Sequence, residues 1–389
     1  DPKTCIACAS PTNPHAIIIM VTPHHHHLVA SVTGLTSLPP PSRLLIDLQP
    51  GSETGSATPT LAASDRPRFS FLPEALWASP ARGAVMTAYR LTAGDWDSGK
   101  VASNSAVDIE CATLAPGTYN FTAQYWNAVG EASPQSSAEF DVGPADETAW
   151  AGASWFGATD QRELRVNFVL PRSSPVSRAR LHVAAPGGVV ISVNGVDAGD
   201  PIGVSAWSSF DARVLYETRA IEGLLSRSSA QQVQLLLGNG FSPLHPYPVA
   251  RFLITLTFAD GTTSMLRPAD LTVEGRAGPM VSDSVKLGSH TNWTLPPDAG
   301  WVPAVTLPPG QAPKGLLVPR ATPAAALGAA VAAADVKPLG NGSWLYTLPA
   351  NIVGHAVRPT LCPTHRSTLG ACPYARRLRR LEWRQPVVA

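Results

Sequence analysis

The residues best suited to chemistry in this sequence are its five cysteines. Cys5 and Cys8 form a Cys-x-x-Cys pair, a spacing found in redox motifs and in half of a zinc site. We favour terminal disulfide anchors in an oxidising compartment, with candidates at Cys5, Cys8, Cys362 and Cys372. A zinc site needs four ligands, and Cys362, His365 and Cys372 complete one only if the two chain ends meet. Because the number of cysteines is odd, Cys111 is left either as a buried thiol or as half of an intermolecular disulfide bridge.

Four consecutive histidines at positions 24–27 are a second candidate for metal binding. Side chains of an extended segment alternate sides, so four in a row cannot all converge on one ion. A solvated linker is the interpretation we favour, and an expression tag is the alternative. The residues themselves therefore predict no metal.

Three asparagines lie in Asn-x-Ser/Thr sequons: Asn120, Asn292 and Asn341. Such sequons are acceptors for N-linked glycans in secreted proteins. The sequence also starts at Asp1 without methionine, as a mature chain does after signal removal, although a fragment would look the same. We therefore expect a glycoprotein that is secreted, either extracellular or at the cell surface.

Length and composition limit the function classes. A chain of 389 residues is too long for one ordinary core and indicates two or three domains. With 29 basic and 28 acidic residues the net charge is +1, which gives no electrostatic reason to bind nucleic acid. The same low charge permits self-association. No apolar stretch reaches the roughly 18 residues that span a bilayer, so we predict no membrane span.

Residues 1–41 predict an extended segment outside any compact domain. It contains an uncharged, β-branched run with strong strand character: Ala16, Ile17, Ile18, Ile19, Met20 and Val21. An isolated strand of this kind is an aggregation hazard unless it pairs. It either completes a sheet within its own chain or adds to an open sheet edge of a neighbouring copy. Other copies of the chain are therefore candidate partners.

The rest of the chain predicts an all-β protein with tandem sandwiches. Residues 42–143 read as an immunoglobulin or fibronectin III-like β-sandwich, in which the Leu-x-Pro-Gly-x-Tyr run ending at Tyr119 is typical of a late strand with a tyrosine corner. Residues 150–294 read as a jelly roll, with hairpin signals at Asn194-Gly195 and Asp260-Gly261. Residues 295–389 read as a Pro/Ala-rich connection with a short β segment and a basic tail.

The order of motifs over residues 113–354 resembles the accessory domains that precede the catalytic barrel of family 78 α-L-rhamnosidases. The segments that carry the resemblance include Trp155, 164–168, 179–181, Asn194-Gly195, 207–210, 214–218, 236–240, 259–262, 278–284, Gly300-Trp301 and 344–354. The resemblance implies a jelly roll that can bind rhamnose, in some members with calcium. It makes Asn194, Asp200 and Trp207 the sugar-binding candidates. The plainer interpretation, which we favour, is that Asn194-Gly195 is only a turn and Trp207 only core.

The departures from the family pattern argue against catalysis. Where the family has carboxylates, this sequence has 288–293, Gly-Ser-His-Thr-Asn-Trp. Few residues follow Gly354, so the barrel that carries the general acid and its partner carboxylate is not expected in this chain. We therefore predict that this chain is not an enzyme.

The function predicted from sequence is that of a non-catalytic structural subunit of an extracellular fibre, appendage or cell coat. It would assemble head to tail by addition of the N-terminal strand, and a heterologous contact of this kind gives open filaments unless the rotation closes. The alternatives are a rhamnose-type carbohydrate-binding module protein and a truncated α-L-rhamnosidase. Cell-surface polysaccharide is then a further candidate partner.

Overall fold

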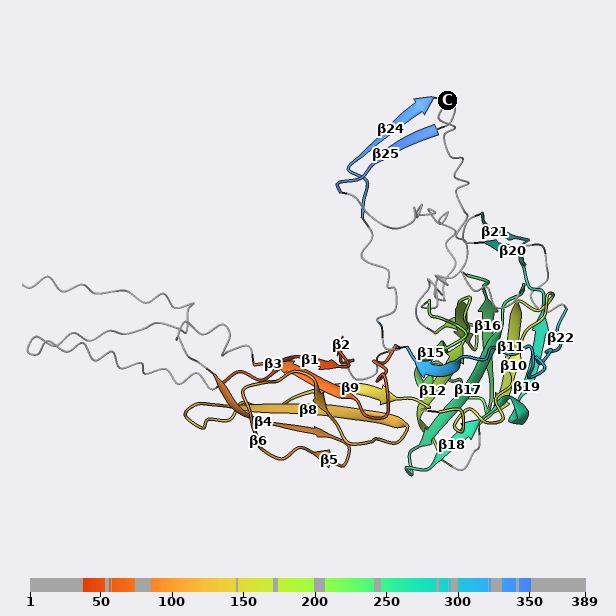
Figure 1. Cartoon of the computed structure of the whole chain (residues 1–389). Helices are drawn as coiled ribbons and strands as arrows, with labels where there is room; N and C mark the ends of the chain where they lie inside the picture. Colours follow the sequence, from red (N-terminus) through yellow and green to blue (C-terminus); the bar gives the residue numbers. More distant parts are fainter. Residues whose placement is uncertain are drawn as a thin grey trace, which may run out of the picture.

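The computed structural model describes residues 38–350 except 53–55, 57, 74–84, 145, 171–173, 199–206, 241–245, 285–286, 293, 295–299, 321, 323–330 and 341–342. Over these residues the chain consists of β-strands, interrupted by two short 3-10 segments, η1 (Glu222–Leu224) and η2 (Pro268–Asp270). The predicted all-β fold class is confirmed (Figure 1). The candidate donor strand 16–21, the terminal cysteines, the four histidines at 24–27, Asp200, Asn341 and the basic tail lie outside the described residues.

The first sandwich packs a four-stranded sheet A on a five-stranded sheet B. Sheet A has the order β2 (Gln49–Pro50), β1 (Ser42–Ile46), β3 (Arg68–Leu72) and β7 (Ile109–Glu110). Sheet B has the order β5 (Trp96–Asp97), β4 (Met86–Ala93), β8 (Gly117–Asn127) and β9 (Ser136–Val142), with β6 (Val101–Ala102) also paired to β4. Phe69 of sheet A stacks on Phe121 of sheet B with ring centroids 4.2 Å apart, so aromatic contacts join the two sheets.

Two local features of the first sandwich follow from its sequence. The Tyr119 hydroxyl donates a hydrogen bond to the Ala115 carbonyl at 2.8 Å, which closes the predicted tyrosine corner. Cys111 is a free thiol with 2% of its surface exposed. Burial raises the pKa of this thiol to about 11. Of the two alternatives for Cys111, the structure has the buried thiol, which is a poor nucleophile at neutral pH.

The second sandwich packs two six-stranded sheets, C and D. Sheet C has the order β10 (Trp155–Phe156), β17 (Ala250–Phe258), β12 (Val176–Ala184), β15 (Arg213–Ala220) and β23 (Leu316–Pro319), with β18 (Thr263–Leu266) also paired to β17. Sheet D has the order β14 (Val196–Asp197), β13 (Val189–Val193), β16 (Ala230–Leu237), β11 (Glu163–Val169), β19 (Thr272–Arg276) and β22 (Val302–Pro303). Their inner faces bury one apolar cluster that includes Leu164, Val166 and Leu181.

Strands from beyond residue 294 complete the second sandwich. Strand β22 pairs with β19, and β23 lies parallel to β15 at the edge of sheet C. Leu307 and Leu317 of this region are buried against sheet C together with Trp150 and Tyr216. The sheets of the second sandwich therefore reach Pro319, well into the segment predicted as a connection.

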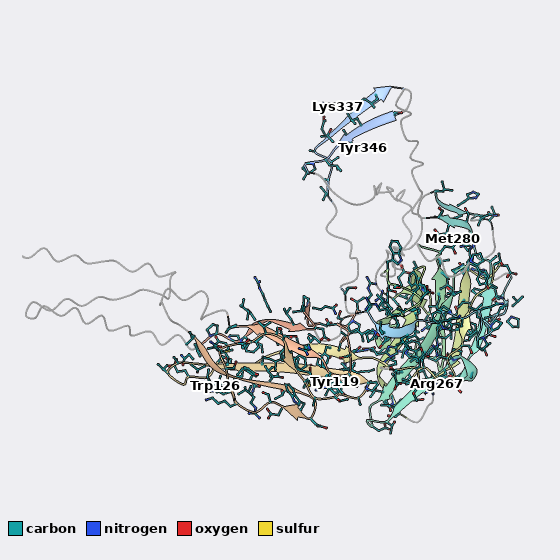
Figure 2. All side chains as sticks on the ribbon, in the orientation of Figure 1. Tyr119, Trp126, Arg267, Met280, Lys337 and Tyr346 are labelled. Carbon is teal, nitrogen blue, oxygen red and sulfur yellow. The ribbon has the colours of Figure 1, made fainter. Side chains whose placement is uncertain are left out.

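Two hairpins stand outside the sandwiches. Strand β20 (Met280–Ser284) pairs with β21 (Gly288–Thr291), and β24 (Asp335–Gly340) pairs with β25 (Ser343–Thr347). Figure 2 labels Met280 on the first hairpin and Lys337 and Tyr346 on the second. No helix among the described residues is long and apolar enough to cross a membrane.

Candidate functional site

The outer face of sheet D carries mostly polar side chains in ordered rows. Because residues alternate along a strand, those opposite each other on paired strands point to the same side. The middle row runs across four strands: Ser192, Gln234, Arg165 and Glu274. One neighbouring row contains Gln232, Asn167 and Thr272. The row on the other side contains Val190, Leu236, Glu163 and Arg276. We call the surface formed by these three rows the open face.

Hydrogen bonds orient several side chains of the open face. Gln232 Nε2 donates to Asn167 Oδ1 at 3.2 Å, and Asn167 Nδ2 donates to Glu274 Oε2 at 3.1 Å. Arg165 Nε donates to the same Glu274 oxygen at 2.9 Å. These bonds fix which atoms are donors and which are acceptors, so the face is a preorganised polar surface.

The charges on the open face cancel. Arg165 pairs with Glu274, and Arg276 Nε lies 2.5 Å from Glu163 Oε2. Two guanidinium groups therefore balance two carboxylates within one sheet face. Such a surface has no net charge with which to select an ionic ligand, but it is rich in directional donors and acceptors.

An aromatic side chain bounds the open face on the side of β19. The ring centroid of Trp301 lies 4.4 Å from the guanidinium carbon of Arg165 and 4.4 Å from that of Arg276. Trp301 precedes β22, whose pairing with β19 brings this residue to the edge of the sheet. Cation–π contact holds the indole beside the two ion pairs.

The outer face of sheet C is covered by the first sandwich and by the connection between the two domains. Arg180 Nε donates to Asp141 Oδ2 on β9 at 2.6 Å, and its Nη1 lies 2.7 Å from Glu222. Arg178 Nη2 lies 3.1 Å from Glu139, also on β9. Arg180 is 6% exposed and Asp141 is 2% exposed, so this is a buried ionic contact between the domains. We call this surface the covered face.

Two further residues complete the covered face. His182 hydrogen-bonds with Thr218 through Nδ1 at 2.9 Å and with Thr255 through Nε2 at 3.2 Å. Burial, and then the charge of Arg180, lower the pKa of His182 to about 3, so the imidazole is neutral. The Tyr216 hydroxyl donates to the Pro144 carbonyl at 3.1 Å, and its burial raises its pKa. A side chain at Gly143 would collide with the Tyr216 hydroxyl.

The structure describes two of the three predicted sugar-binding residues and places them on different elements, Asn194 in the turn after β13 and Trp207 shortly before β15. Asn194 occupies the turn between β13 and β14 with a φ of 50°. Its Nδ2 donates to the Leu224 carbonyl at 2.9 Å and to Gln231 Oε1 at 2.8 Å, and its Oδ1 accepts from the backbone N–H of Gln232 at 3.0 Å. Trp207 is 70% exposed, so the favoured interpretation of this residue as part of the core was wrong. Asn194 thus acts locally as a turn residue, and the ligand role of all three candidates, including Asp200, stays a prediction.

Two of the three sequons fall on described, exposed residues. Asn120 lies on β8, and Asn292 follows β21. Asn292 Oδ1 accepts hydrogen bonds from the N–H of Thr294 at 3.0 Å and from its hydroxyl at 2.7 Å. Both side chains are accessible to a modifying enzyme, and their glycosylation stays a prediction.

Sequence reasoning missed the residues that make the open face. The alternation over 164–168 carried the signal, since Arg165 and Asn167 stand between buried Leu164, Val166 and Phe168. Nothing local indicated that Trp301 would join them, because its contacts depend on the pairing of β22 with β19.

Family comparisons match both sandwiches. Residues 54–146 match the Rha78A-like, N-terminal immunoglobulin domain. Residues 174–307 match the alpha-L-rhamnosidase N-terminal domain. The chain carries the N-terminal domain pair of family 78 α-L-rhamnosidases. The predicted resemblance to the non-catalytic front end of these proteins is confirmed, and both matches describe N-terminal domains. No curated protein sequence matches the chain.

Solved rhamnosidase structures share the fold of this domain pair. The α-L-rhamnosidase from Dictyoglumus thermophilum aligns with a TM-score of 0.63 at 19% identity, over 80% of this chain and 38% of its own. The Streptomyces avermitilis α-L-rhamnosidase, solved with L-rhamnose, gives 0.63 at 15% identity, over 78% of this chain and 48% of its own. The Aspergillus terreus α-L-rhamnosidase gives a TM-score of 0.61 at 15% identity, over 78% of this chain and 38% of its own. The chain therefore spans less than half the length of these relatives.

Proposed function

We propose that this rhamnosidase-type domain pair is a secreted carbohydrate-binding module and that its open face holds the sugar. The observation that carries the proposal is the row Ser192, Gln234, Arg165 and Glu274 with the Trp301 ring against Arg165. Sugars are recognised by many directional hydrogen bonds from planar amide, carboxylate and guanidinium groups together with contact to an aromatic ring. The open face combines these groups on one solvent-facing sheet.

Binding to a glycan array tests this proposal. The intact chain should bind at least one neutral glycan, and Trp301→Ala should lower that binding by about tenfold, as expected when one well-packed aromatic contact is lost. Trp126→Ala is the matched control, because Trp126 lies in the first sandwich with Lys100 Nζ 4.5 Å from its ring centroid. Equal binding by the Trp301 and Trp126 variants would contradict the role of the open face.

The residues predicted from the family resemblance, Asn194, Asp200 and Trp207, are the rival candidates. Trp207→Ala separates the two proposals, because Trp207 is one of these candidates and is not part of the open face. Loss of binding in this variant with full binding by Trp301→Ala would move the sugar site to the surface around Trp207.

Secretion and N-glycosylation are part of the proposal. Exposure of Asn120 and Asn292 supports it. Treatment of the native protein with peptide N-glycosidase, followed by mass spectrometry, should convert glycosylated asparagines to aspartate at these positions. Unmodified asparagine at all three sequons, Asn341 included, would contradict it.

A second candidate function is a fibre or coat subunit that assembles by strand addition. Its support is the β24–β25 hairpin, whose strands pair only with each other among the described residues. An isolated hairpin is marginally stable in water, so this hairpin would be stabilised by a third strand from a neighbouring copy. Deleting residues 1–22 should abolish assembly as seen by size exclusion and electron microscopy. Unchanged assembly after the deletion, or a native protein that is always monomeric, would contradict this function.

The third alternative is a truncated rhamnosidase. It concerns how far the coding sequence extends and makes no statement about the open face. In that case the domain pair would be the front end of a longer enzyme. Sequencing the full transcript tests it, since a continuing reading frame that encodes a barrel would establish it and an early stop codon would exclude it.

A further inference from the structure

The open face is larger than one sugar ring. Its middle row crosses from β13 to β19, three strand spacings, or about 14 Å. Along β11 the face extends from Glu163 to Asn167, again about 14 Å at roughly 3.4 Å per residue. Polar groups therefore cover an area on which a single pyranose could contact only part of the row.

The two ends of the middle row differ. At the β19 end the indole of Trp301 lies over Arg165 and Arg276 and limits the face. At the other end β13 is followed only by the two-residue strand β14, whose residues are exposed. A ligand that abuts Trp301 can therefore extend toward β13 without meeting another element of sheet D.

The side chains along this direction remain able to bind. Ser192 and Gln234 form no side-chain hydrogen bond with another described residue, whereas Arg165 and Glu274 are paired with each other. Both Ser192 and Gln234 are partly exposed. They offer a hydroxyl and an amide, which match the hydroxyl groups of a sugar and carry no charge.

We infer that the open face binds a neutral oligosaccharide lengthwise along the middle row, with one end against Trp301 and Arg165 and the chain running from there over Gln234 to Ser192. The inference rests on the proposed function and adds the ligand class: several linked neutral sugars, in place of one terminal sugar or an acidic glycan. The balanced ion pairs Arg165–Glu274 and Arg276–Glu163 disfavour uronic acids, because no uncompensated cation faces the ligand.

The test is a chain-length series on the intact protein. Mono- to tetrasaccharides of L-rhamnose, D-mannose and D-glucose are the neutral probes, and an oligogalacturonide series is the acidic probe. In at least one neutral series affinity should rise by about tenfold from mono- to trisaccharide, because added units form further hydrogen bonds. The acidic series should not exceed it.

A variant at the far end of the row sharpens the test. Ser192→Arg should lower trisaccharide affinity by about tenfold and leave monosaccharide affinity unchanged, since only a longer ligand reaches β13. Ser137→Arg, at an exposed position on β9 of the first sandwich, is the matched control and should change neither.

The outcomes separate the inference from the function on which it rests. Equal affinity for mono- and trisaccharide, or preferred binding of oligogalacturonides, would overturn the inference and leave a carbohydrate-binding module. No binding to any series would overturn both. A trisaccharide preference that Ser192→Arg does not alter would overturn the proposed direction of the chain.

Discussion

The second sandwich has two outer faces that use similar side chains in opposite surroundings. On the covered face Arg178 and Arg180 reach across to Glu139 and Asp141 of the first sandwich. On the open face Arg165 and Arg276 pair within sheet D beside Trp301, where Arg165 is partly exposed and Arg276 is buried. A buried charge needs a partner fixed by the fold, whereas a partly exposed pair such as Arg165–Glu274 can stay in contact with water. The covered face therefore joins the domains, and the open face remains available to a ligand.

The largest expected effect comes from breaking the covered face. Arg180→Ala leaves Asp141 buried without its cation and should lower the free energy of unfolding by about 3–5 kcal/mol. Urea unfolding followed by tryptophan fluorescence measures it. Arg90→Ala, which breaks the exposed Arg90–Asp97 pair of the first sandwich, is the matched control and should have little effect. Similar losses in the two variants would contradict the distinction between buried and exposed pairs.

The next effect is a dependence of stability on pH through His182. In the unfolded chain this imidazole takes up a proton near its ordinary pKa of about 6.5, whereas in the folded protein it does so only near a pKa of about 3. Acid therefore favours unfolding between these values, by up to about 1.4 kcal/mol per pH unit.

His182→Gln tests this dependence, since glutamine can hydrogen-bond to Thr218 and Thr255 and does not titrate. Thermal melts from pH 7 to pH 4 should show a smaller acid loss of stability in the variant than in the native protein. An equal loss of stability per pH unit in the variant and the native protein would mean that His182 is not held neutral in the folded state.

Trp301→Ala should have a moderate effect on stability. Its two cation–π contacts contribute about 0.5–1 kcal/mol each, so the free energy of unfolding should fall by about 1–2 kcal/mol. Trp301→Phe should lose less than half as much free energy of unfolding as Trp301→Ala, because a phenyl ring still faces the guanidinium groups. A larger loss than for Arg180→Ala would show that Trp301 is a core residue and not the border of a binding face.

The smallest effect on stability belongs to Gln234. Its side chain is partly exposed and forms no hydrogen bond with another described residue, so Gln234→Ala should change the free energy of unfolding by less than about 0.5 kcal/mol. Binding of a neutral oligosaccharide, measured by titration calorimetry, should nevertheless weaken. Unchanged affinity would remove Gln234 from the binding row.

Features that depend on neighbours in sequence could be predicted. The Tyr119 corner involves a carbonyl four residues away, and the Asn194-Gly195 turn needs two residues with positive φ. The family resemblance likewise identified the two domains. These inferences required no knowledge of which strands pair.

The identity of the covered and open faces could not be predicted. Leu164-Arg165-Val166-Asn167 and Leu181-His182-Val183 both read as strands with polar residues on one side. Only the long-range contact of β9 with β12 buries Arg180 and its neighbours, and only the pairing of β22 with β19 brings Trp301 to Arg165. Parallel pairing of β23 with β15 is equally non-local, so the predicted end of the second sandwich fell short of Pro319.

Hydrogen–deuterium exchange of the intact protein with and without a neutral trisaccharide tests the central claim most directly. The open face should be protected by the sugar, so slower exchange is expected in β11, β13, β16 and β19, with no change in β12 or β9 of the covered face. Protection confined to the residues around Trp207, or to the first sandwich, would contradict the assignment of the open face as the sugar-binding surface.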